Sequence, residues 1–177
     1  MTTKIDSKII TFQHAELILK WIDRLEATDE IKNMYEFKLI LRGSRDGFTP
    51  ETFHEICDNQ SHTVTIIKEK NSNEILGGYN PIAWKSVGGY TATNDSFIFS
   101  FSNDNIESHT LSRVIDKEHA IYNISDYGPS FGTRDLDLYG NEENKLYDWE
   151  ISYEKQITAK PISWPSVEEY EVFQIIK

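Results

Sequence analysis

Apolar residues recur at helical spacing near the start of the chain and at every second position from Tyr35 onward. Over residues 11–27 they fall three or four positions apart, which predicts an amphipathic helix. Thr11 stands at its start, where a side-chain oxygen can accept a hydrogen bond from a free N–H of the first turn. The polar stretch 27–33 ends this helix. Its apolar face consists of Ala15, Ile18, Ile22 and Leu25.

A second, shorter helix is predicted from residue 50. Thr49 can cap it, and Pro50 suits the first helical position because the N–H that proline lacks would be unpaired there. Glu51 favours the positive end of the helix dipole. The polar residues 58–60 end the helix. Its apolar face consists of Phe53, Ile56 and Cys57.

Strands dominate the rest of the chain, because alternating apolar runs are separated by turns rich in Asn, Gly and Ser. A doubly wound α/β fold needs a helix after most strands, and the pattern provides few helices. We therefore expect a mostly β, α+β fold: a two-sheet antiparallel β-sandwich with flanking helices, preceded by an N-terminal helix. The predicted strands cover residues 35–42, 62–69, 74–79, 96–102, 111–115, 120–124, 135–139, 147–153 and 170–176.

Length and charge narrow the choice of function. The 177 residues suit one sandwich domain, 34–177, with a helical lead-in over 1–33. The 18 basic and 29 acidic residues give a net charge of −11, and a surface this acidic repels phosphate backbones and anionic membranes. We therefore expect neither nucleic-acid binding nor membrane insertion. The acidity suits a basic protein partner but is also ordinary for a soluble cytosolic protein. The opening residues lack the apolar core of a signal peptide, which favours a cytoplasmic location.

Acidic residues concentrate in the C-terminal half of the chain. They are compatible with a solvated sheet face and with a patch for a basic partner, and the pattern leaves both open. An exposed aromatic side chain would be the first candidate for a contact surface, because amphipathic rings are enriched at binding hot spots. The candidate rings are Trp84, Tyr90, Trp149 and Trp164, most of which we expect to lie in the core.

Ser130 is the centre of Gly128-Pro129-Ser130-Phe131-Gly132, which matches the G-x-S-x-G pattern of a nucleophile elbow. Such an elbow has a helix after the serine and usually a later histidine. Here a strand pattern follows, and the last histidine is His119. We interpret the motif as a tight turn, with a hydrolytic enzyme as an alternative.

Two other groups of residues resemble metal sites. Asp135–Gly140 resembles the start of an EF-hand loop, but Leu146 stands where that loop has its bidentate Glu. His54, Cys57 and His62 could together hold zinc. However, Cys57 falls on an apolar helix face, where a free cysteine packs as a small hydrophobe. We expect core packing for this sole cysteine and no cofactor, with a redox-active enzyme as the alternative.

The glycine-rich segments do not predict a nucleotide site. Gly43–Gly47 lacks the lysine that follows the second glycine of a phosphate-binding loop. Gly77 and Gly78 follow a strand, but no helix comes after them. We expect a turn at the first segment and a bulge or close backbone approach at the second.

In this order, the motifs resemble those of the TLDc domain family over roughly residues 34–175. The matching stretches are 37–48, 53–59, 63–68, 75–79, 84, 95–101, 127–132, 135–136 and 169–173. The resemblance implies a β-sandwich, oxidative-stress resistance, and binding and regulation of the vacuolar proton-pumping ATPase, without an established catalytic mechanism. It also leaves open a structural accessory domain of a BTB-type adaptor.

The family motifs mark a set of positions in this chain as structural or interaction residues, none of them catalytic. These are Arg42, Gly43, Arg45, Asp46, Gly47, Gly77, Gly78, Tyr79, Gly128, Pro129, Ser130, Phe131, Gly132 and Asp135. The function that follows from the resemblance is a non-catalytic protein-interaction domain.

Overall fold

Six strands form the larger of two sheets in the computed structural model, which describes residues 5–102, 105–139, 151–158 and 162–177. The strand order is β1-β11-β2-β3-β5-β6, and every neighbouring pair is antiparallel. This sheet was predicted closely except for β6, which was expected over 111–115 and begins earlier. Its strands are β1 (Glu36–Arg42), β2 (Thr63–Glu69), β3 (Glu74–Asn80), β5 (Phe97–Ser102), β6 (Asn105–Arg113) and β11 (Val167–Ile176).

The second sheet has five short strands in the order β10-β9-β8-β7-β4. Its β9–β10 pair is parallel and its other pairs are antiparallel. The predicted two-sheet, mostly antiparallel architecture is therefore confirmed. The strands are β4 (Tyr90–Thr91), β7 (Ile121–Tyr122), β8 (Tyr127–Phe131), β9 (Leu136–Tyr139) and β10 (Ile162–Ser163).

Strand β8 corrects the expectation of a tight turn at the G-x-S-x-G motif. The pairing of β8 with β9 shifts register between Tyr127 and Ser130. Such an irregularity tolerates Pro129, whose missing N–H cannot join a regular ladder. The predicted strand over 120–124 shortens to β7, which follows η1 (Lys117–His119). Most of the strand predicted over 147–153 lies outside the described residues.

The helices follow the local signals in the sequence. Helix α3 (Pro50–Cys57) begins as predicted, with the hydroxyl of Thr49 accepting a hydrogen bond from the Thr52 N–H at 3.2 Å. Helix α1 (Phe12–Ile22) ends earlier than expected, and Arg24 then adopts a left-handed φ of 55°. A short helix, α2 (Gly43–Asp46), replaces the expected turn. Residues Trp164–Ser166 form η2.

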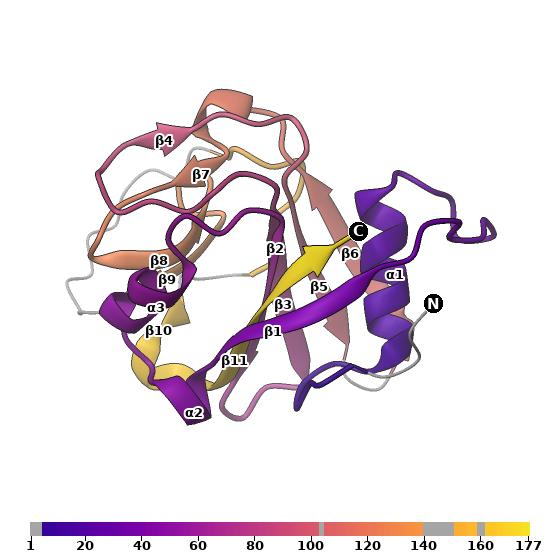
Figure 1. Cartoon of the computed structure of the whole chain (residues 1–177), viewed down its shortest axis with the longest axis horizontal. Helices are drawn as coiled ribbons and strands as arrows, with labels where there is room; N and C mark the ends of the chain where they lie inside the picture. The colour runs from indigo at the N-terminus through magenta and orange to yellow at the C-terminus, as the bar shows by residue number, and fades with distance from the viewer. Residues whose placement is uncertain (1–4, 103–104, 140–150, 159–161) are drawn as a thin grey trace.

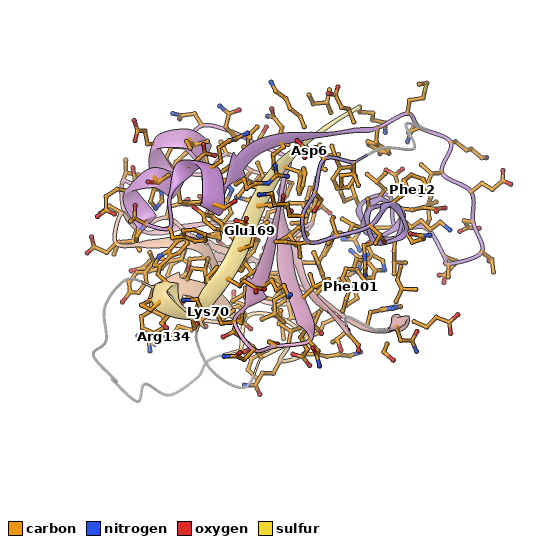
Figure 2. All side chains as sticks on the ribbon, turned by 90° about the horizontal axis from the view of Figure 1, so that it is seen from below. Asp6, Phe12, Lys70, Phe101, Arg134 and Glu169 are labelled. Atoms are coloured by element: carbon orange, nitrogen blue, oxygen red, sulfur yellow. The ribbon has the colours of Figure 1, made fainter. Side chains whose placement is uncertain are left out.

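Both faces of the six-stranded sheet are covered. Figure 1 shows α1 on one side of this sheet and the five-stranded sheet on the other. Phe97, Phe99 and Phe101 point toward α1, whereas Ile98 belongs to the core between the sheets, as the alternation in β5 predicts. In Figure 2, α1 with its labelled Phe12 lies beside the sheet that carries Phe101. The molecule therefore has two cores, one on each face of this sheet.

Candidate functional site

Arg42 ends β1 in a buried ionic cluster. Its Nη2 donates to Glu171 Oε2 at 2.7 Å and to Asp6 Oδ1 at 2.9 Å, and its Nε also donates to Glu171. Glu171 is fully buried, and its other oxygen accepts a hydrogen bond from the Ser7 hydroxyl at 2.6 Å. A buried carboxylate needs such partners, because an unpaired charge is costly away from water. The cluster therefore fastens the N-terminal segment to β11.

Other residues of the 42–47 motif also form hydrogen bonds and packing contacts within the chain. Asp46 accepts two hydrogen bonds from Arg45 and one from the Arg42 N–H at 2.9 Å. The hydrogen bond with Arg45 lowers the pKa of the Asp46 carboxyl. A Cβ on Gly43 would lie 2.5 Å from the Phe48 ring, so no other residue fits there without movement. This motif holds a tight corner after β1.

Gly77, Gly78 and Tyr79 serve packing in β3. A Cβ on Gly77 would lie 2.4 Å from the Phe99 ring, on the α1 side of the sheet. A Cβ on Gly78 would lie 2.6 Å from the Phe131 ring, between the two sheets. Tyr79 is buried, and burial raises the pKa of its hydroxyl to about 12. The expected close backbone approach is present at Gly77, where a Cβ would lie 2.4 Å from the Thr65 carbonyl oxygen, whereas Gly78 makes room for a side-chain ring and no bulge forms in the described strand β3.

Ser130 is fully buried in β8, and its hydroxyl donates to the carboxyl of Asp137. Burial raises the pKa of Asp137 to about 7. Among the described residues, the Ser130 hydroxyl forms no hydrogen bond with a histidine, so no serine–histidine pair assembles there. Asp135 is also turned inward, accepting hydrogen bonds from the Ser152 and Tyr153 N–H groups at 3.1 Å. A Cβ on Gly132 would lie 2.0 Å from the Asp135 carboxylate.

The proposed zinc trio is not assembled. Cys57 is fully buried, as its position on the apolar helix face predicted, and burial raises the pKa of its thiol. Both ring nitrogens of His54 are hydrogen-bonded within the chain: Nδ1 lies 2.7 Å from Asp58 Oδ1, and Nε2 lies 2.7 Å from the Tyr127 carbonyl oxygen. In the described part of the chain, no group of three or more His, Cys, Asp or Glu side chains could hold a metal ion.

Of the aromatic rings proposed as contact residues, Trp84 and Trp164 are buried, and Trp149 lies outside the described residues. Tyr90 is 41% exposed. Its ring stacks on Tyr122 with centroids 4.7 Å apart, and the Tyr122 and Tyr127 centroids are 6.3 Å apart. We call Tyr90, Tyr122 and Tyr127 the tyrosine ladder.

The ladder runs across three neighbouring strands, β4, β7 and β8, of the five-stranded sheet. Val87, on the loop before β4, is 84% exposed. Sequence reasoning named Tyr90 but missed Tyr122 and Tyr127, which become its neighbours only when the strands pair. Stacked rings carry large contact area with few rotatable bonds, so they suit binding to another protein. The ladder is therefore a candidate contact surface.

Comparison with known proteins gives a single family. The model of the TLDc domain family matches residues 3–176, nearly the whole chain, including the N-terminal helix. A search of the curated proteins gave no match. Within the described residues, no helix is long and apolar enough to cross a membrane.

Proposed function

The chain belongs to the TLDc domain family, and on that premise we propose that it is a non-catalytic cytoplasmic interaction domain. Its proposed partner is the peripheral sector of the vacuolar proton-pumping ATPase, which it binds and regulates. Resistance to oxidative stress follows from that regulation. The tyrosine ladder is the proposed contact surface.

One contrast supports this proposal. Ser130 and Cys57, the two candidate nucleophiles that the sequence suggested, are fully buried within the core, and burial raises the pKa of the Cys57 thiol. A thiol reacts as the thiolate, so a raised pKa opposes redox chemistry. Tyr90, by contrast, is exposed and stacked on a neighbouring ring. Among these residues, the one that reaches the surface is therefore an aromatic ring suited to contact.

The proposal is tested by mixing the purified protein with the purified peripheral sector. We expect the two to co-purify on size-exclusion chromatography and the rate of ATP hydrolysis to change. Tyr90→Ser should weaken co-purification. Met34→Ser is the matched control, because Met34 is also exposed (74%) and lies on the segment before β1, outside the ladder. No co-purification and no change in hydrolysis would contradict the proposal, and an equal loss in both variants would exclude the ladder.

A further inference from the structure

A groove of about 470 Å³ adjoins the tyrosine ladder, between the first turn of α3 and the turn that leads into β8. Tyr127 belongs to both the groove and the ladder, so the two form one continuous surface. The residues that line the groove and matter for its chemistry are Phe48, Pro50, Glu51, Asp126, Tyr127 and Trp164.

The two walls of the groove are held together by His54. Its ring lies on α3, the helix that carries Glu51, and its Nε2 lies 2.9 Å from the carbonyl oxygen of Ile124 and 2.7 Å from that of Tyr127. These carbonyls bracket Asp126 in the opposite wall. On the other side of the ring, Nδ1 lies 2.7 Å from Asp58 Oδ1. The groove is therefore formed before any partner arrives, which reduces the entropy cost of binding.

Aromatic rings make the floor of the groove. The ring of Tyr170, in β11, packs against Phe48 and Trp164, with centroid distances of 5.8 Å and 4.8 Å. The Tyr170 hydroxyl donates to the Gly47 carbonyl at 3.2 Å, which holds this ring in place. Trp164 is only 6% exposed, and its buried indole Nε1–H has no hydrogen-bond partner among the described residues. An occupant of the groove would therefore meet the edge of a buried ring and not a free hydrogen-bond donor.

Two carboxylates give the groove negative charge. Glu51 and Asp126 are both exposed, and neither belongs to an ion pair among the described residues. Within that part of the chain, no Lys or Arg lines the groove. The net charge of −11 adds long-range attraction for a basic group. A phosphate or carboxylate ligand would be repelled from this surface.

Carboxylates beside aromatic rings match one side chain best. A guanidinium group is planar and always charged, stacks on aromatic faces and pairs with carboxylates through two parallel hydrogen bonds. We propose that the groove binds an arginine side chain in an extended, basic segment of a partner protein. The segment continues over Tyr127 onto the tyrosine ladder. This inference rests on the proposed function, because it assigns the chemistry of the partner at the same surface.

The test is a nuclear magnetic resonance titration of the full chain with acetyl-Gly-Arg-Gly-Arg-Gly-amide. A peptide with citrulline in place of arginine keeps the shape and removes the charge. We expect saturable shifts at the Trp164 indole N–H and at the amides of Glu51 and Tyr127, with the citrulline peptide giving none. Glu51→Gln/Asp126→Asn should weaken binding about tenfold, the expectation for losing two exposed ion pairs.

The control variant is Glu36→Gln/Glu107→Gln, which makes the same change in net charge at exposed positions on β1 and β6. It should bind the arginine peptide as the unaltered chain does. Shifts outside the groove, equal weakening in both variants, or equal binding of the citrulline peptide would overturn the assignment. The titration contains no ATPase, so loss of ATPase binding refutes the proposed function alone, and loss of peptide binding refutes the groove alone.

Discussion

Replacing Gly78 by alanine should loosen the contact between the two sheets. The added Cβ would lie 2.6–2.8 Å from three atoms of the Phe131 ring, closer than real Cβ contacts. Phe131 is fully buried and packs edge-on against Trp84 with centroids 5.4 Å apart, so its ring has no free space to enter. The strain therefore spreads into the strands on both sides.

The expected loss of stability can be estimated from this geometry. Overpacking a filled core costs about 1–3 kcal/mol. For a chain of this size, a loss of about 2 kcal/mol lowers the melting temperature by about 4–8 °C. Gly77→Ala should cost more, because its Cβ would also lie 2.4 Å from the Thr65 carbonyl oxygen, a backbone atom.

Differential scanning calorimetry of Gly78→Ala, Gly77→Ala and Gly88→Ala checks this reasoning. Gly88 is the comparator, because a Cβ there meets nothing within 4 Å and its cost arises only from a backbone φ of +88°. We expect about 1 kcal/mol at Gly88, less than at either β3 glycine. The reasoning is refuted if Gly78→Ala melts with the unaltered protein, or if Gly88→Ala is the most damaging change.

Three further predictions concern buried polar groups. Arg42→Met leaves the buried Glu171 carboxylate unpaired and should lower the free energy of unfolding by about 3–5 kcal/mol; a loss under about 1 kcal/mol in urea unfolding would count against the cluster. Burial raises the pKa of Asp137 to about 7, so the folded state holds its proton more tightly than the unfolded state does. The stability from this group is full below about pH 4 and is lost as the pH rises through about 7. As the pH rises over that range, the urea midpoint of the unaltered protein should therefore fall relative to that of Asp137→Asn. Urea midpoints of the two proteins that change in parallel with pH would contradict this. Burial raises the pKa of the Cys57 thiol, so a thiol reagent should modify Cys57 no faster than the rate at which the protein unfolds locally. Rapid modification of the native protein would contradict this and support a redox role.

The sequence predicted the elements that depend on local signals. Thr49 and Pro50 determine the start of α3 through capping, which involves only neighbouring residues. The alternation around Phe99 located β5 and its two faces, because strand periodicity directly reflects which side is buried. Strand β8 was missed because the Gly-Pro pair at 128–129 favours a turn, and only pairing with β7 and β9 makes it a strand.

The candidate site was less predictable, because it is made by tertiary contacts. Tyr90 and Tyr122 are 32 positions apart and meet only because β4 pairs with β7. The groove joins the start of α3 to Asp126 through His54, whose partners are backbone carbonyls that no sequence motif marks. Trp164, one of the four candidate rings, lies in the groove floor because it packs on Tyr170. Local sequence patterns carry no information about contacts between residues so far apart in the chain.

Hydrogen–deuterium exchange of the protein, free and bound to the ATPase peripheral sector, tests the central claim most directly. The claim is that the ladder and its adjoining groove form the contact surface. We expect binding to slow exchange in residues 48–51, 86–91 and 122–127, and to leave α1 unchanged. Slowed exchange confined to α1 and the segments beside it, with these three stretches unaffected, would contradict the account.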